Sequence, residues 1–338
     1  MTSEDTPAPF AFFRLATSYQ ITQALSVAAK LGIADQLADG PKTLDELAHA
    51  IGANAATLRL LMRALSTIDI FAETSEGRFM LTPLASYLRS DTPYSQRGWA
   101  ISQAQITYRA WAELLHTVTS GQPAFEHVFG TNYYDYMAQH PEAAAEWDRS
   151  MDQTARDWLG ALATSYDFAP IQTIVDVGGG HGAALADILK HIPTMRGILF
   201  DLPHVVAGAG PLLAEAGVAE RCEVIGGDMF AEVPSGGDAY LISRVLFNWD
   251  DQHARALLQS CRRAMTPHAK LLVIDVVDSD ADKPKAAAFG DLNLLLLFGG
   301  RQRTESEFHA LFASAGFAIT RILPTQSHFK LVEARLLE

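Results

Sequence analysis

The chain has 338 residues, of which 49% are hydrophobic and 19% charged, and its formal net charge is −13. This composition excludes extended disorder, and the length predicts two domains that each bury a core of their own. The negative charge disfavours a nucleic-acid partner, because binding to a phosphate backbone depends on clustered Lys and Arg. The acidic start lacks the basic stretch of a signal peptide and no apolar run is long enough to span a membrane, so we expect a cytoplasmic protein with no membrane partner.

The first hundred residues are predicted to be mainly helical. Thr43 followed three residues later by Glu46 is the pattern of a capping box at the start of a helix. Helices over 44–51 and 56–68, followed by an alternating stretch over 71–81, are typical of a winged helix-turn-helix.

A winged helix-turn-helix often binds DNA, but the charges of this segment argue against that function. Residues 41–90 hold five Lys or Arg and five acidic residues, so the segment is neutral. We therefore favour a structural role in pairing two subunits, with a DNA-binding regulator as the alternative.

Residues 98–165 are predicted to continue as helices that are rich in large aromatic side chains. Most of these side chains are expected to pack in the core, and a few to line a pocket for a flat, apolar substrate. Tyr134 and Trp147 are the aromatic candidates for that pocket, with core packing as the alternative for both.

After Asp167 the pattern changes to short β-branched runs that alternate with helices. Each run is typical of a buried parallel strand, and the alternation predicts a doubly wound α/β sheet. The strands are predicted at 171–177, 196–200, 222–225, 239–242 and 270–276.

A glycine-rich turn follows the first of these strands and leads into a predicted helix over 183–191. Glycines such as Gly178 and Gly180 allow a ligand to approach the backbone, and the helix N-terminus supplies N–H donors. Asp201 ends the second strand, where a carboxylate can accept both ribose hydroxyls of an adenosine. Asp228 ends the third strand and can accept the adenine amino group, while Met229 and Phe230 enclose the ring.

Four motifs carry a resemblance that extends over nearly the whole chain. They are Val175-Asp176-Val177-Gly178-Gly179-Gly180, Asp201-Leu202-Pro203-His204-Val205, Gly227-Asp228-Met229-Phe230 and Gly299-Gly300-Arg301-Gln302-Arg303-Thr304. The chain resembles the plant and bacterial small-molecule O-methyltransferases, which use S-adenosylmethionine (SAM) and release S-adenosylhomocysteine (SAH). The resemblance implies a Rossmann-like domain behind a winged-helix domain that forms a homodimer, and a small-molecule substrate such as a phenolic or polyketide-like metabolite.

The resemblance also implies domain limits and further site residues. We expect a winged-helix dimerisation domain over 1–100, a helical linker with pocket residues over 101–165, and a SAM-binding domain over 166–338. Met151 is implied near the transferred methyl group. The predicted cofactor-binding residues are Gly178, Gly180, Asp201, Leu202, Asp228, Met229, Phe230, Ser243, Arg244 and Trp249.

The chain departs from its relatives at the catalytic base. Family members read Leu-His-Asp-Trp where this chain reads Leu246-Phe247-Asn248-Trp249, a pattern similar to the anthracycline-tailoring branch. An apolar ring at Phe247 cannot accept a proton. The two acids that hold the family's His also differ, since Asp275 replaces one Glu and Gln302 the other. These positions, with Asn248, are the predicted catalytic residues.

Loss of the base leaves two reaction classes open. A general base contributes about 10²–10⁴ in rate, whereas orientation in a dry pocket supplies about 7–11 kcal/mol, so methyl transfer to oxygen can proceed by proximity. The alternatives are a non-methylating reaction with bound SAM, such as cyclisation or hydroxylation, or methylation of nitrogen or carbon.

Further pocket candidates lie towards the C-terminus, and each has a structural alternative. Asn248 either orients the acceptor or caps the following helix. Arg303 either reaches the substrate or pairs with an acid such as Glu305 or Glu307. Asn293 and Leu297 complete the predicted pocket. No metal site is expected, because the histidines have no ligand spacing.

Overall fold

The computed structural model describes residues 7–92, 95–145, 147–148, 151, 165–279, 288–325 and 327–337. The chain divides into two compact units. The first comprises Met1–Arg109 and Glu142–Gln153, and the second Ala110–Pro141 and Thr154–Glu338. The segment predicted as a linker, 101–165, therefore contributes residues to both units.

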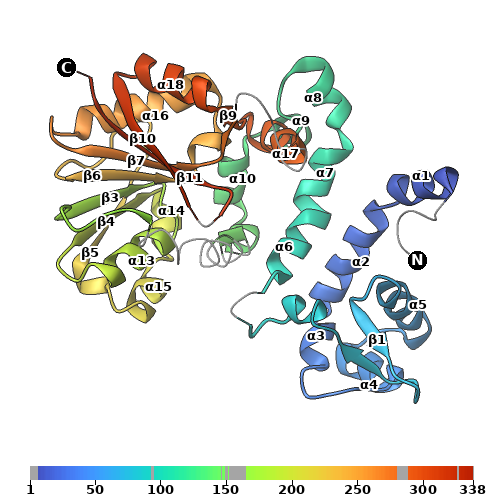
Figure 1. The fold of residues 1–338 in the computed structure, drawn as a ribbon. Helices are drawn as coiled ribbons and strands as arrows, with labels where there is room; N and C mark the ends of the chain where they lie inside the picture. Colours follow the sequence, from blue (N-terminus) through green and yellow to red (C-terminus); the bar gives the residue numbers. More distant parts are fainter. Residues whose placement is uncertain are drawn as a thin grey trace. The chain divides into compact units, whose positions relative to one another are not determined.

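The first unit is mainly helical, as predicted (Figure 1). Its capping box is present, because Thr43 N–H donates to Glu46 at 2.6 Å and Glu46 N–H donates back to the Thr43 hydroxyl at 3.3 Å. Its elements are α1 (Ala8–Ala16), α2 (Tyr19–Lys30), α3 (Ile33–Gln36), α4 (Leu44–Ile51), α5 (Ala55–Ser66), β1 (Phe71–Glu73), β2 (Phe79–Leu81), η2 (Ala85–Leu88), α6 (Arg97–Ser102), η3 (Gln103–Thr107) and the start of α7 (Tyr108–Ala112).

The winged helix-turn-helix is confirmed as a structural motif. Helices α4 and α5 are followed by the antiparallel pair β1 and β2, in which Phe71 lies opposite Leu81. The two helices and the wing share one core, which includes Leu47, Met62 and Phe79 with no exposed surface.

The second unit is built on a seven-stranded sheet in the order β10-β11-β7-β6-β3-β4-β5, and Figure 1 shows helices on both of its faces. Five parallel strands form most of the sheet, and an antiparallel hairpin completes it. The strands are β3 (Thr173–Val177), β4 (Arg196–Asp201), β5 (Cys222–Gly226), β6 (Ala239–Ser243), β7 (Lys270–Asp275), β10 (Phe317–Pro324) and β11 (Lys330–Leu336), with a separate pair β8 (Val277–Asp278) and β9 (Arg303–Thr304).

Alternation along each strand supplies both faces of the sheet with apolar side chains. In β3, Val175 and Val177 face one core and Ile174 faces the other. The first core is closed by α16 (Asp251–Ala264) and α18 (Glu305–Ser314), and the second by α13 (Ala183–His191) and α15 (Gly210–Glu215). The other helices among the described residues of the unit are α8 (Leu114–Ser120), α9 (Ala124–Phe129), α10 (Tyr133–Gln139), α14 (Pro203–Val206), η4 (Ala219–Arg221), η5 (Leu246–Asn248) and α17 (Ala288–Phe298).

Two features of the sheet differ from the sequence-based expectation. The strand predicted as buried at 222–225 is β5, which forms the edge of the sheet and exposes Glu223 and Val224. Its β-branched residues predicted a strand correctly, but burial depends on a neighbour that β5 has on one side only. The hairpin of β10 and β11 was not predicted.

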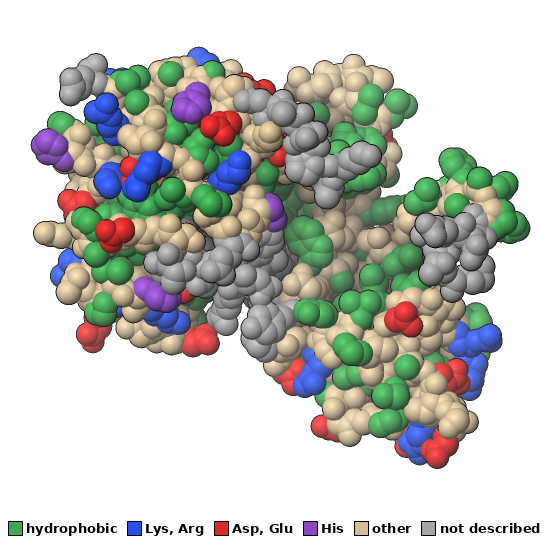
Figure 2. Space-filling model, in the orientation of Figure 1, with side chains coloured by type: hydrophobic (Ala, Val, Ile, Leu, Met, Phe, Trp, Pro, Cys, Tyr) green, Lys and Arg blue, Asp and Glu red, His purple; other side chains and the backbone are tan. Residues whose placement is uncertain are grey.

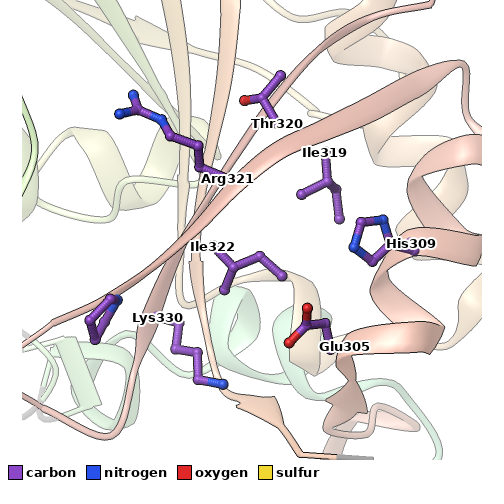
Figure 3. Close-up of a pocket in the computed structure, with 8 residues that line it drawn as sticks. Glu305, His309, Ile319, Thr320, Arg321, Ile322 and Lys330 are labelled. Carbon is purple, nitrogen blue, oxygen red and sulfur yellow. The ribbon is translucent and has the colours of Figure 1, made fainter.

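An open depression of about 410 Å³ lies at the opposite edge, between α18 and β10 (Figure 3). In Figure 3, His309 and Glu305 extend from α18 and line the depression together with Ile319 of β10. None of the predicted site residues lines this depression. Within the part of the chain that the model describes, no helix has the length and apolar character needed to cross a lipid bilayer.

Candidate active site

The glycine turn lies where the order of strands reverses. From β3 the chain adds β4 and β5 on one side and then returns to place β6 on the other, so the ends of β3 and β6 diverge. Gly178 and Gly180 adopt positive φ angles of 71° and 60°. A Cβ on Gly178 would lie 3.0 Å from a Val245 methyl group and 3.7 Å from the Met229 sulfur. Only glycine therefore keeps this turn narrow.

Asp201 ties the glycine turn to the end of β4. Its carboxylate accepts the Gly180 N–H at 2.8 Å and the Leu202 N–H at 2.7 Å. Burial raises the pKa of Asp201, and these two N–H donors oppose that rise. A carboxylate has about four accepting positions, so two remain for a ligand.

Asp228, Met229 and Phe230 follow β5 at the same rim of the sheet. The Asp228 carboxylate accepts the Phe230 N–H at 2.9 Å, which fixes a tight turn. The Phe230 ring meets the Trp249 indole edge-on, with centroids 4.8 Å apart and planes at 85°. The structure thus brings the predicted β5 residues next to Trp249.

Trp249 and Tyr134 form a stacked pair, with centroids 5.2 Å apart and planes 18° apart. The Tyr134 side chain also forms a hydrogen bond with that of Asn248. Burial, with the nearby Asp201 charge, raises the pKa of the Tyr134 hydroxyl well above 10. The Trp249 indole N–H is buried and has no partner among the residues that the model describes.

The base position holds an apolar stack. The Phe247 ring faces the Phe329 ring, with centroids 6.4 Å apart and planes 16° apart. The Phe247 N–H and the Val276 N–H donate to the Asp275 carboxylate at 3.1 Å and 2.7 Å. Burial raises the pKa of Asp275 to about 7. The Asp275 carboxylate therefore binds backbone N–H groups, and position 247 itself carries no side chain that can act as a base.

Arg303 clamps the segment that carries Phe247, Asn248 and Trp249. Its guanidinium, 1% exposed, donates to the Leu246 carbonyl at 3.1 Å, the Trp249 carbonyl at 2.7 Å and the Asp251 carboxylate at 2.9 Å. Gly300 packs on the same segment, since a Cβ there would lie 2.1 Å from the Phe247 carbonyl oxygen.

These contacts decide two alternatives that the sequence left open, the partner of Arg303 and the role of Asn248. Arg303 pairs with Asp251 and not with Glu305 or Glu307, because Glu307 caps α18 and pairs with Arg301. Asn248 does not cap the next helix. The cap of α16 is Asp250, whose carboxylate accepts the His253 N–H at 2.8 Å. The Asn248 amide bonds Tyr134 instead.

Ser243 and Arg244 lie at the end of β6. Arg244 adopts a φ of 60°, and its N–H donates to the Ile274 carbonyl at 2.8 Å. Its guanidinium lies 5.8 Å from the centre of the Phe329 ring. Both predicted residues are thus at the rim that holds the glycine turn.

The predicted pocket residues are divided between the two units. In the second unit, the side-chain Oδ1 atom of Asn293 accepts the Trp111 indole N–H at 2.9 Å, and Leu297 is 2% exposed. Trp147 and Met151 belong to the first unit, where Trp147 packs against Trp99 with ring centroids 6.0 Å apart. A pocket role for these residues stays a prediction.

Sequence reasoning missed Phe329, and it placed Trp111 only among the aromatic side chains of residues 98–165. Phe329 follows the unpredicted turn between β10 and β11, and Trp111 lies 182 residues before its partner Asn293. No local pattern signals either contact. Among the described residues, no group of three or more His, Cys, Asp or Glu side chains is placed to hold a metal ion.

Comparison with known proteins decides the family. A model of the O-methyltransferase domain matches residues 111–318, and a model of the O-methyltransferase dimerisation domain matches residues 13–91. The chain belongs to the O-methyltransferase family. It is a SAM-dependent methyltransferase.

Its similarity to individual members of the family extends over nearly the whole chain. The methyltransferase is 46% identical over 329 residues to a phenazine O-methyltransferase from Lysobacter antibioticus, covering 97% of this chain and 96% of the relative. It matches the crystal structure of LaPhzM with a TM-score of 0.94 and 46% identity, covering 98% and 100% of the two chains.

Another member of the family was crystallised with SAM and an aromatic acid. The O-methyltransferase of neocarzinostatin biosynthesis, in complex with SAM and 2-hydroxy-5-methyl naphthoic acid, matches with a TM-score of 0.83 and 32% identity. The match covers 94% of this methyltransferase and 96% of that chain.

The residues of the rim fit the cofactor of this family. Gly178 carries no side chain to fill the space beside Val245 and Met229 at the switch point, and Asp201 retains accepting positions for ribose hydroxyls. The buried Trp249 N–H lacks a partner among the described residues, and a polar group of a bound nucleoside satisfies such a donor.

Proposed function

We propose that the enzyme methylates a hydroxyl group on a flat, fused-ring aromatic metabolite, by orienting the acceptor without a side-chain base. The observation that carries this proposal is the stack of Phe247 on Phe329 at the base position. Trp249, two residues after Phe247, stacks on Tyr134 and adds a second aromatic pair. Flat rings pack well against such side chains. The relatives that act on phenazines and naphthoates support the same acceptor class.

The cofactor is held by the rim described above. Bound SAM supplies a methyl group already activated on a positively charged sulfur. Asp201 takes the ribose hydroxyls and Asp228 the adenine amino group, while Gly178 and Gly180 admit the ligand to the backbone. The other proposed cofactor contacts are Leu202, Met229, Phe230, Ser243, Arg244 and Trp249.

The protein's own contribution to the reaction is to orient the acceptor towards the methyl group and to exclude bulk water from the site. Arg303 and Asp275 form hydrogen bonds with the backbone of 246–249, and Gly300 packs against it, so the acceptor meets a rigid wall. Orientation of this kind lowers the barrier by about 7–11 kcal/mol. Loss of a general base costs a factor of about 10²–10⁴ in rate, which is about 3–5 kcal/mol and therefore less. The acceptor proton leaves to water.

We also propose that the enzyme is a homodimer joined through the first unit and works in the cytoplasm. Helix α1 buries none of its residues, and Phe10, Phe12, Phe13 and Leu15 are 65–74% exposed. Figure 2 shows apolar side chains gathered over this helix. The dimerisation-domain match supports pairing through it. Cys222 and Cys261 are free thiols, which suits a reducing compartment.

Product mass tests the proposed reaction. The enzyme is incubated with SAM and a panel of hydroxylated phenazines and naphthoic acids, and one acceptor is expected to gain a single methyl group while SAH forms. An unchanged mass or one added oxygen would show cyclisation or hydroxylation in its place. No product with any member of the panel would reject the proposed acceptor class.

Titration calorimetry with SAH tests the cofactor site. Asp201→Ala is expected to weaken SAH binding about 100-fold, because two charge-assisted hydrogen bonds are lost. The control Glu223→Ala, on the exposed edge strand β5, should leave the affinity unchanged. Equal affinity in wild type and Asp201→Ala would remove Asp201 from the site.

A further inference from the structure

Gln302 is held in one place by the residues on either side of it. Its N–H donates to the Asp291 carboxylate of α17 at 3.0 Å. The next residue, Arg303, is clamped to the carbonyls on both sides of the Phe247–Asn248 segment. Gly300, two residues earlier, lies against that segment itself. The position of Gln302 is therefore coupled to the wall of the proposed acceptor site.

The two ends of the Gln302 amide have different surroundings. A Cβ on Gly290 of α17 would lie 3.3 Å from the Gln302 Nε2 atom, so the amide nitrogen packs closely against that helix. The Oε1 atom is buried, and none of the described residues donates a hydrogen bond to it.

A buried carbonyl oxygen without a donor destabilises the folded protein. An apolar side chain of similar length, such as Met, would fill the same space without that cost. A glutamate would be worse, because its charge would be buried without a partner. The glutamine is thus unfavourable for stability alone, and residues of this kind collect at binding sites.

We propose that Gln302 recognises the acceptor: its Oε1 atom accepts a hydrogen bond from an O–H or N–H group of the bound aromatic. This inference rests on the proposed function. It narrows the substrate class to hydroxylated or aminated rings that present a donor to Gln302. A methyl ether of the same ring cannot satisfy Oε1, so the site discriminates against a methylated ring at that position.

Thermal unfolding of the ligand-free enzyme tests the inference without any acceptor. Gln302→Met removes the buried carbonyl and is expected to raise Tm by about 2–4 °C. The matched control Gln252→Met, on the exposed face of α16, should leave Tm unchanged. A purely structural glutamine predicts the opposite sign, so a fall in Tm, or no change, would overturn the proposal.

Binding to the SAH-loaded enzyme tests recognition directly. The probes are the acceptor identified by product mass, for example a hydroxylated phenazine, and its methyl ether. Wild type is expected to bind the hydroxyl form about tenfold more tightly than the ether, a difference of about 1.4 kcal/mol, and Gln302→Met should bind both equally. An undiminished preference in the variant would overturn the inference while leaving the methyltransferase reaction intact. If wild type methylates nothing, the proposed function fails, and the Tm measurement still decides the role of Gln302.

Discussion

The Tyr134 ring lies nearly parallel to the Trp249 indole, with centroids 5.2 Å apart, and its hydroxyl is hydrogen-bonded to the side chain of the preceding residue, Asn248. One side chain of α10 thus contacts two successive residues at the end of η5. Because burial raises the Tyr134 pKa well above 10, the hydroxyl stays protonated throughout an ordinary assay range. Tyr134 therefore positions its neighbours and takes no proton.

Substitution of Tyr134 separates the ring from the hydroxyl. Tyr134→Phe keeps the stack and loses one hydrogen bond, so kcat/KM for the acceptor should fall about tenfold or less. Tyr134→Leu loses both contacts and should fall further. Steady-state kinetics between pH 6 and 9 measure both effects, with the same pH profile expected for wild type and Tyr134→Phe. An alkaline limb that disappears in the Phe variant would make Tyr134 a base.

Removal of the Arg303 clamp should destabilise the whole second unit. Arg303→Met removes one hydrogen-bond donor from each of three acceptors, the Leu246 carbonyl, the Trp249 carbonyl and the Asp251 carboxylate. Asp251 keeps its bond from Arg301, and the Leu246 carbonyl keeps that from the Trp249 N–H. Because the three lost bonds come from a buried charged group, the free energy of unfolding should fall by about 3–5 kcal/mol. The exposed Arg335→Met should change it by less than about 0.5 kcal/mol. Denaturant unfolding compares the two, and equal midpoints would show that the clamp carries no stability.

Asp176 should make the protein less stable as pH rises. Its carboxyl is fully buried beneath Gly179, and burial, with the Asp201 charge, raises its pKa to about 7. The folded protein then holds a proton that the unfolded chain releases near pH 4, so stability falls as pH rises from about 4 to about 7. Asp176→Asn should remove this pH dependence, so that the loss in free energy of unfolding between about pH 4 and 7 becomes smaller by a few kcal/mol. Thermal unfolding across this range measures it, and parallel curves for variant and wild type would contradict the prediction.

Glu333 provides a control of opposite sign for the pH experiment. Although burial alone would raise its pKa, bonds from Arg321, Tyr166 and Thr320 hold it at about 2. Its stabilisation is present above the unfolded pKa near 4.5 and is lost as pH falls towards 2. In Glu333→Gln, the fall in stability between about pH 4.5 and 2 should therefore be smaller than in wild type, and the pH dependence above 4.5 should be unchanged.

The exposed face of α1 should control the oligomeric state. Phe12→Asp with Phe13→Asp places charges on a face that is expected to be buried between subunits, and should convert a dimer to a monomer in light scattering. Val224→Asp, an equally drastic change on the exposed edge strand β5, serves as the control and should leave the dimer intact. A dimer that survives the α1 substitutions would place the interface elsewhere.

Local chemistry explains what could be predicted without a structure. The capping box of Thr43 and Glu46 and the helix Ala183–His191 depend on neighbours a few residues away. The strand positions followed from apolar periodicity. Because parallel strands end at one rim, the placement of Asp201 and Asp228 after successive strands was enough to predict a shared site.

Only the tertiary structure decided which side chains meet across long separations. The partner of Arg303 is Asp251, the ring facing Phe247 is Phe329, and Asn293 receives its hydrogen bond from Trp111. The exposure of β5 was likewise decided by the tertiary structure, as was the burial of the Gln302 Oε1 atom, to which no described residue donates a hydrogen bond. Periodicity reports which face of an element is apolar, but burial and hydrogen bonding depend on which distant element covers that face, and that is set only when the whole chain packs.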